Sequence, residues 1–274
     1  MCDWAMVEGG VVETAGAVAA SSAGTTVTAG ALNTKGSWAE LDAATARAAG
    51  AIVILCNRHG SGTTDYLIDI GIGAAGSEQV VISNLISCNS AGSNSPGGWW
   101  LAPLSIPAGT RLAARCQAST ASAQIRVEAL LLGESAQQPA LSRVATYGAA
   151  TADSGGTSID PGGSANTKGA WTQLASATSA DHQGLILGVG YQANGTRTTC
   201  SWLVDIGVGA AGSEQTIVSN LLLTCDASTD HIAPSATAFL PVAIPAGTRL
   251  AVRAQSDITN ATDRLFDAVL YGVG

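Results

Sequence analysis

Apolar and polar side chains alternate with a period of two along much of this chain. In residues 110–117 every second side chain is apolar, and the positions between them include Arg111 and Arg115. Arg249 and Arg253 recur in the same pattern further along the chain. A period of two with charge on one face is typical of a β-strand that packs on a core from one side. We therefore predict strands in both stretches.

Similar runs, separated by residues typical of turns, fill the first half of the chain. Their spacing is typical of a β-sandwich or β-barrel, and no stretch has the pattern of an ordinary amphipathic helix. We predict roughly eight strands in this half, with one of nine candidate runs expected to be a loop. The candidate runs lie near residues 11–17, 24–28, 37–45, 50–57, 64–71, 79–87, 99–105, 110–117 and 124–132.

The second half of the chain repeats the first. Residues 69–79, D-I-G-I-G-A-A-G-S-E-Q, return as residues 205–215 with a single change, from isoleucine to valine. Residues 106–113 return unchanged as residues 244–251. A repeat this long is no solenoid repeat, so it predicts two domains of one fold.

Weaker matches set the limits of the repeat. Residues 12–16 align with residues 144–148, and residues 127–133 align more loosely with residues 266–272. About eight antiparallel strands with one polar and one apolar face favour a jelly roll or a related β-sandwich. We predict an all-β chain with two tandem homologous jelly-roll-type β-sandwich domains, residues 1–135 and 143–274, joined by a linker at residues 136–142.

Each copy also contains the pattern G-x-G-x-x-G, at residues 71–76 and 207–212. A dinucleotide-binding turn of this kind follows a strand, opens a helix, and has an acidic residue about 20 positions later. The residues that follow, 80–86 and 216–222, are mostly β-branched and apolar, which favours strands. We therefore predict a glycine-rich corner between two strands and no cofactor.

Charge and hydropathy exclude two classes of partner. The net charge is −8 and the only lysines are Lys35 and Lys168, whereas a nucleic-acid-binding protein needs a basic face. No apolar run is long enough for a transmembrane helix. The first four residues, Met1 to Trp4, lack the basic start of a secretory signal. We expect no nucleic acid, no membrane insertion, and synthesis in a cytoplasm.

Candidate catalytic and metal-binding residues do not cluster in the sequence. The histidines His59, His182 and His231 occupy non-equivalent positions in the two halves, and we expect them at the surface. The six cysteines form no C-x-x-C pair, so we expect small core residues rather than a metal site. Cys2, near the terminus, is the cysteine we expect to react or to cross-link subunits. We predict no catalytic residue and no metal ligand.

Asp69 and Asp205 lie on the strand face opposite the large apolar residues. We predict an exposed cross-strand ion pair with the repeated arginines, worth only a fraction of a kcal/mol. The alternative is a contact with a polar ligand or with another subunit.

Trp99 and Trp100 have no counterpart in the second half. Adjacent residues of a strand point to opposite faces, so one of the two tryptophans is expected to face outward. An exposed tryptophan is a typical anchor for an interface or for a stacked sugar ring. We predict a contact site here, with Trp4 as a second candidate.

The shared motifs carry a resemblance to a known group of proteins. D-I-G-[IV]-G-A-A-G-S-E-Q, S-N-L and I-P-A-G-T-R-L-A-x-R-x-Q resemble motifs of uncharacterised virion structural proteins of tailed bacteriophages, and they occur in both halves. The resemblance implies a jelly-roll-type module in a phage particle, with other virion proteins and copies of itself as partners. It brings no catalytic residues with it.

Three functions follow as hypotheses. The first is a non-enzymatic virion structural protein: a capsid decoration, a collar, or a tail or fibre component. The second is a carbohydrate- or host-receptor-binding module on the virion that binds a surface glycan. The third is a two-domain oxidoreductase, which requires a helix directly after Gly76 and Gly212.

Overall fold

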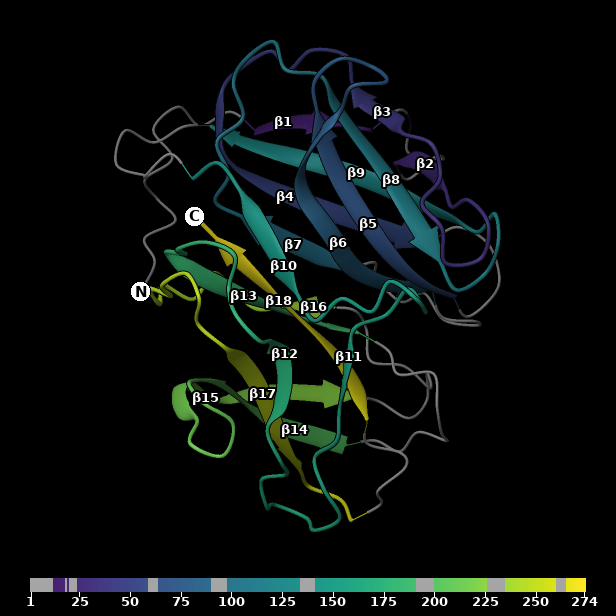
Figure 1. Cartoon of the computed structure of the whole chain (residues 1–274). Coiled ribbons are helices and arrows are strands. Elements are labelled where there is room, and N and C mark those ends of the chain that lie inside the picture. The colour runs from purple at the N-terminus through teal and green to yellow at the C-terminus, as the bar shows by residue number, and fades with distance from the viewer. Residues whose placement is uncertain are drawn as a thin grey trace.

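A computed structural model shows an all-β chain (Figure 1). The described residues form 18 strands and no helix, and so contain no helix that could span a bilayer. The structure describes residues 12–17, 19, 24–58, 64–89, 98–133, 141–190, 200–225, 235–259 and 265–274.

The first half of the chain forms two antiparallel sheets. Its strands are β1 (Val12–Ala15), β2 (Thr25–Thr28), β3 (Ala39–Asp42), β4 (Ala49–Arg58), β5 (Thr64–Ile72), β6 (Gln79–Asn89), β7 (Trp99–Ala102), β8 (Leu112–Ala118) and β9 (Gln124–Gly133). One sheet has the order β1-β9-β4-β7, with β2 also paired to β9, and the other has the order β3-β8-β5-β6. All nine candidate runs are strands, so the expectation that one of them is a loop was wrong.

The second half forms two further sheets with the same strand order. Its strands are β10 (Val144–Tyr147), β11 (Thr157–Ile159), β12 (Thr172–Ala175), β13 (Gly184–Gly190), β14 (Cys200–Val208), β15 (Gln215–Cys225), β16 (Ser235–Ala236), β17 (Leu250–Ser256) and β18 (Phe266–Val273). The sheets run β10-β18-β13-β16, with β11 on β18, and β12-β17-β14-β15. Each strand takes the place of its counterpart nine numbers earlier.

The strand register corrects the alignment of the last strand of each half. In the first half Val127 pairs with Thr25 of β2, and in the second half Ala268 pairs with Thr157 of β11. Val127 therefore corresponds to Ala268, two residues beyond the position that the sequence alignment gave it. The alignment was wrong here because these two strands share few residues, and only pairing with neighbouring strands fixes the register.

The apolar core follows from the predicted alternation. In β9, for example, Ile125, Val127, Ala129 and Leu131 are at most 2% exposed, and the residues between them are more exposed. One core cluster lies wholly in the second half, whereas the first half's cluster also includes second-half residues such as Ile186 and Tyr271.

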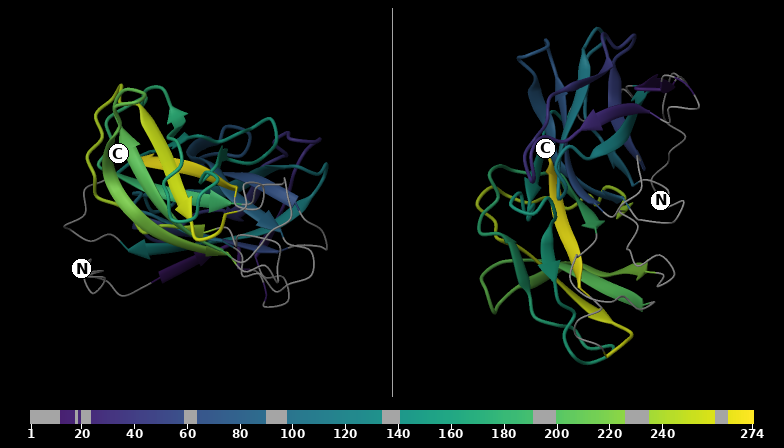
Figure 2. Two further views of the ribbon diagram at one scale, coloured as in Figure 1. Left: turned by 90° about the horizontal axis from the view of Figure 1, so that it is seen from below. Right: turned by 90° about the vertical axis from the view of Figure 1, so that its right-hand side faces the viewer.

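The two halves therefore pack against each other. In Figure 1, β10, β13 and β18 cross the middle of the molecule, between the first-half sheets above and β12, β14, β15 and β17 below. The right-hand view in Figure 2 shows the same order. The contact with the first half is made through β6, which meets β10 and β13, and through β7, which meets β16.

Candidate functional site

Asp69 on β5 is the centre of a buried polar cluster. Its Oδ1 accepts hydrogen bonds from Lys35 Nζ at 2.7 Å and from the Asn84 backbone N–H at 2.9 Å. Its Oδ2 accepts one from Arg115 Nε on the neighbouring strand, also at 2.9 Å. The Asp69 side chain is only 5% exposed. The predicted cross-strand pair is present, but the prediction that it is exposed was wrong, because Lys35 and the β6 backbone close over the carboxylate.

Asp205 has the same environment in the second half. It accepts hydrogen bonds from Lys168 Nζ at 2.7 Å, from the Asn220 backbone N–H at 2.9 Å and from Arg253 Nε at 3.0 Å. The four members of each cluster come from separate segments of the chain, and each of these segments is repeated in the other half. Their repetition therefore reflects one structural requirement that is met twice.

The glycine-rich motif makes room for a tryptophan ring. The Arg115 guanidinium lies 4.6 Å from the centroid of the Trp38 ring, in a cation–π contact. A Cβ atom at Gly71 would lie 2.7 Å from that ring, so a larger residue would displace it. The same arrangement in the second half is formed by Arg253, Trp171 and Gly207.

The rest of the motif forms the corner between β5 and β6. Gly73 and Gly76 have φ values of 106° and 81°, a region that favours glycine. Arg111 Nη1 donates to the Gly73 carbonyl oxygen at 3.2 Å and to the Glu78 carboxylate at 2.9 Å, which fixes the corner. Strand β6 follows, as predicted, where a dinucleotide-binding turn would begin a helix.

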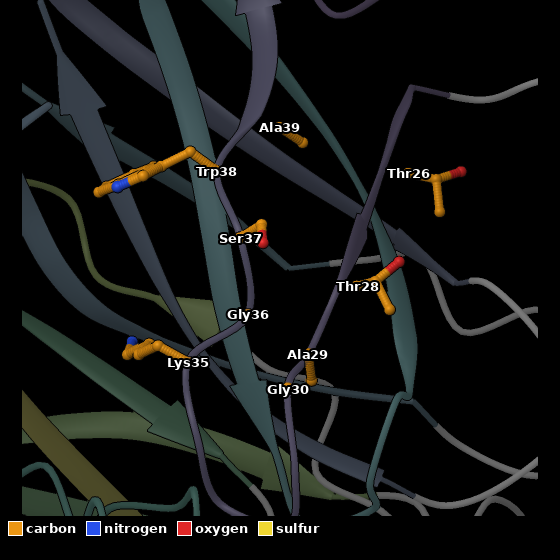
Figure 3. A pocket seen from close by; sticks show the side chains of 9 residues that line it. All are labelled: Thr26, Thr28, Ala29, Gly30, Lys35, Gly36, Ser37, Trp38 and Ala39. Carbon is orange, nitrogen blue, oxygen red and sulfur yellow. The ribbon is translucent and has the colours of Figure 1, made fainter. Parts of the chain in front are cut away.

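Two shallow hollows lie near these repeated motifs in the first half. One of about 570 Å³ lies beside residues 26–30 and 35–39 (Figure 3). Lys35 and Trp38 point away from residues 26–30, toward the buried cluster, so mostly backbone and small side chains face the hollow. The other, of about 470 Å³, lies beside the glycine-rich corner and Arg111. Among the described residues that line either hollow there is no His, Cys, Asp or Glu.

His182 is buried, so the expectation of a surface position was wrong for this histidine. It is 3% exposed, its Nε2 lies 2.7 Å from the Tyr147 hydroxyl, and Gly272 leaves space for its ring. Burial lowers the pKa of His182, and the nearby Arg143 lowers it further. His59 and His231 lie outside the described residues.

Four cysteines are buried, as expected of small core residues: Cys56, Cys88, Cys116 and Cys200. Burial raises the pKa of Cys116 to about 12, which keeps its thiol protonated and unreactive at neutral pH. Within the described residues, no group of three or more His, Cys, Asp or Glu side chains is placed to hold a metal ion.

Acid is expected to destabilise the protein in two steps. The folded-state pKa of His182 is lowered, so below pH 6.5 the unfolded chain binds a proton that the folded chain does not. Burial alone would raise the pKa of Asp205, but hydrogen bonds from Lys168, Asn220 and Arg253 lower it overall. Stability should therefore fall below about pH 6.5 and fall again below about pH 4.

Urea unfolding followed at a series of pH values would measure both steps. A His182→Gln variant keeps a hydrogen-bonding side chain and should lose the upper step while it retains the lower one. An upper step of unchanged size in this variant would contradict the assignment to His182.

Trp99 and Trp100 face opposite sides of β7, as predicted. Trp99 is 64% exposed and Trp100 is 2% exposed. Trp99 is thus the member of the pair that is available for contact. Trp4 and Cys2, the two other predicted contact residues, lie outside the described residues, as does most of the predicted linker.

The apolar interface between the halves includes hydrogen bonds to the outward-facing edge of β6. The Tyr271 hydroxyl accepts a hydrogen bond from the Ile86 backbone N–H at 2.9 Å and lies 3.1 Å from the Asn84 carbonyl oxygen, to which it donates. Thr146 Oγ1 bonds Ser83 at its hydroxyl and at its carbonyl oxygen. The second half thereby satisfies backbone groups that an open sheet edge would leave to water.

Glycines allow the close approach at this interface. A Cβ atom at Gly190 would lie 2.6 Å from Ile86 Cδ1, and one at Gly188 would lie 3.2 Å from Ile86 Cγ2. The Ile86 side chain is therefore seated over these two glycines of β13 and is only 2% exposed.

A second contact between the halves is polar. Gln117 Nε2 donates to the Thr151 carbonyl oxygen at 2.7 Å and to Ser154 Oγ at 3.1 Å. Asn33 Nδ2 donates to the Ala152 carbonyl oxygen at 2.6 Å. The turn at residues 150–155 thus fastens the second half to the first at a separate place.

Replacing Tyr271 by phenylalanine is expected to weaken the contact between the halves. The change leaves the Ile86 N–H and the Asn84 carbonyl without their shared partner, at a cost of about 1–3 kcal/mol. Tyr66→Phe is the matched control, because the Tyr66 hydroxyl bonds the Gln124 carbonyl oxygen at 2.9 Å within the first half.

Chemical denaturation would compare the two variants. Tyr271→Phe should separate the unfolding of the two halves into distinct transitions, and Tyr66→Phe should shift the transition without splitting it. Equal effects of the two variants would contradict a special role for Tyr271 in coupling the halves.

Comparison with known proteins yields little. No protein-family profile matches the sequence, and no curated protein matches it. Among solved structures, PNGF-II matches with a TM-score of 0.35 and 8% identity, over 86% of this chain and 59% of the PNGF-II chain. The chain thus spans less than two thirds of that protein. A likeness at this level carries no conclusion about function.

Proposed function

We propose that this chain is a non-enzymatic structural protein of a bacteriophage virion that assembles through its two β-sandwich halves. The observation that carries the proposal is the interface between the halves, in which Tyr271, Gly188 and Gly190 pack on the edge strand β6. A β-sandwich that buries its sheet edge against a second, similarly ordered sandwich is suited to repetitive assembly.

We further propose that each half is a jelly roll, so that the chain holds tandem homologous domains at residues 1–135 and 143–274. The strand orders β2-β9-β4-β7 and β3-β8-β5-β6, with the same orders in the second half, support this. Two packed four-stranded antiparallel sheets occur in jelly-roll domains of viral capsids and lectins.

The repeated motifs also fit a structural role. The Asp69 and Asp205 carboxylates each accept hydrogen bonds from three donors and are at most 5% exposed, so each holds neighbouring strands of one sheet together. The partners proposed are other virion proteins and copies of this chain, in a capsid decoration, a collar, or a tail or fibre. The protein would be made in the host cytoplasm and act in the virion.

Purified particles of a phage that encodes this chain would test the proposal. Quantitative mass spectrometry should find the protein at a constant copy number per particle, and antibodies against the recombinant chain should label one part of the particle. Recovery of the protein only from the particle-free lysate would overturn the proposal.

Trp99 favours a second candidate, a module that binds a surface glycan or host receptor. Its indole is 64% exposed, and an exposed aromatic ring is a platform on which a sugar ring can stack. A glycan array would test this candidate: binding by the native chain that is lost in Trp99→Ala would support it. Equal binding by both proteins would exclude Trp99 as the platform.

A further inference from the structure

Strand β15 of the second half corresponds to β6 of the first half, but the interface between the halves covers only β6. The pairing of β15 with β14 matches that of β6 with β5, so Leu222 corresponds to Ile86. Ile86 is 2% exposed, whereas Leu222 is 67% exposed. The difference arises because β6 is covered by β10 and β13, and among the described residues no equivalent strands cover β15.

Among the described strands, only β14 pairs with β15, so no described strand lies along its other edge. In β6 the Tyr271 hydroxyl bonds the Ile86 N–H and the Asn84 carbonyl oxygen. No described residue bonds the corresponding N–H of Leu222 or the carbonyl oxygen of Asn220. Residues 215–225 contain no charged side chain. A long, uncharged, apolar edge strand readily pairs with another chain unless something covers it.

The first half carries the complementary surface. In the second half, the surface that covers β6 includes Val144 and Thr146 on β10, and their counterparts on β1 are Val12 and Thr14. Val12 is 52% exposed and Thr14 is also exposed, whereas Val144 is 6% exposed. We call this surface the outer face; its residues are Val12, Thr14, Val53, Leu130 and Leu132, which correspond to Val144, Thr146, Ile186, Tyr271 and Val273. Val12 and Thr14 are exposed, Leu130 and Leu132 are half-buried, and Val53 is 7% exposed.

We propose that β15 of one copy docks on the outer face of a second copy, so that the chains associate head to tail. The proposal deepens the structural role proposed above by naming its partner. The interface between the halves joins two different faces of similar units, and each chain has one further face of each kind that no described strand covers. Contacts of this heterologous type continue from copy to copy, into a closed ring or an open filament.

Thr14 has the chemistry that this docking requires. Its counterpart Thr146 bonds the hydroxyl and the carbonyl oxygen of Ser83. The residue of β15 that corresponds to Ser83 is Ser219, which is exposed. Thr14 of one copy can therefore bond Ser219 of the next in the same way.

The contact between copies differs from the contact within a chain at its centre. The strand register places Leu55 and Asn57 where the second half has Gly188 and Gly190, and Leu130 where it has Tyr271. Leu222 would therefore meet a leucine and an asparagine side chain rather than two glycines, and no tyrosine hydroxyl would bond the β15 edge. Both changes predict that the association between copies is weaker than the interface between the halves and depends on protein concentration.

Two single substitutions test the proposal in the full-length chain. Leu222→Asp places a charge on β15, and Val12→Asp places one on the outer face. Both positions are more than half exposed, so neither change should disturb folding. Leu32→Asp is the matched control, because Leu32 is 59% exposed and lies on neither face. Thermal melts monitored by circular dichroism would verify that all three variants fold.

Analytical ultracentrifugation would then follow association across a range of concentrations. The native chain and Leu32→Asp should form larger species as concentration rises, and Leu222→Asp and Val12→Asp should each remain monomeric. An equimolar mixture of the last two should form a dimer and nothing larger, because the intact β15 of Val12→Asp can dock on the intact outer face of Leu222→Asp.

Three outcomes would overturn the proposal: a native chain that stays monomeric at every concentration, loss of association in Leu222→Asp but not in Val12→Asp, or a mixture that fails to dimerise. The second outcome would indicate two β15 strands paired symmetrically. None of these results depends on whether the protein is found in phage particles, so failure here is distinguishable from failure of the proposed virion role.

Discussion

Replacing Asp69 by asparagine is expected to lower the free energy of unfolding by about 3 kcal/mol. The carboxylate accepts hydrogen bonds from three donors: Lys35 Nζ, Arg115 Nε and the Asn84 backbone N–H. An asparagine has the same shape, but its amide nitrogen would face at least one of these donors. The two cations would also lose their counter-charge.

The size of this effect follows from burial. Removing one partner of a buried pair typically costs roughly 3–5 kcal/mol. The lower end applies here because the Lys35 and Arg115 side chains are 19% and 32% exposed, so water partly solvates the charges that remain. Asp205→Asn should cost a similar amount, and the two effects should add because the clusters share no residue.

Glu40→Gln is the control for Asp69→Asn. Glu40 pairs with Arg111 at 2.7 Å, but its side chain is 50% exposed. Such a surface pair is worth at most about 1 kcal/mol, so the change should be small. Urea denaturation would compare the variants. A shift for Asp69→Asn no larger than that for Glu40→Gln would contradict the buried-cluster interpretation.

Replacing Gly36 by alanine is expected to destabilise the protein by a similar amount, about 3 kcal/mol. A Cβ atom there would lie 2.0 Å from the carbonyl oxygen of Thr28. The obstacle is backbone, which cannot rotate away as a side chain can. Gly36 also donates its N–H to the Cys116 carbonyl oxygen at 2.8 Å, so moving it would disturb the link to β8.

Gly163→Ala is the matched control for this substitution. A Cβ atom at Gly163 would meet nothing within 4 Å. Without a clash, alanine mainly restricts the unfolded chain and should leave stability unchanged or raise it by up to about 1 kcal/mol. Thermal and urea unfolding would separate the two outcomes, and a Gly36→Ala variant as stable as Gly163→Ala would show that the β2 segment can shift.

Much of the fold could be predicted from the sequence. A period of two, as in residues 110–117, marks a strand wherever one face is buried and the other is not. The β-branched residues after the glycine-rich corner indicated β6 rather than a helix, and the structure confirms that strand. Two adjacent tryptophans implied one outward and one inward ring, as found for Trp99 and Trp100. These are local properties of the backbone.

The polar clusters could be predicted only in part. The sequence paired Asp69 with a repeated arginine, because both lie on the polar face of their strands. It did not reveal that Lys35 reaches the same carboxylate, although its repetition as Lys168 was a signal. Lys35 lies in the loop before β3, and no periodicity fixes the direction of a loop side chain. His182 escaped prediction for a similar reason: Gly272, on a distant strand, leaves space for its ring.

The sequence by itself determined the strands and the repetition, because both depend on local patterns that occur in each half of the chain. Only the tertiary structure decided what the repetition means for contact. Ile86 and Leu222 occupy equivalent positions on equivalent strands, yet one is 2% and the other 67% exposed. The difference arises because the second half of the chain packs on β6. No local sequence pattern encodes such packing between distant segments.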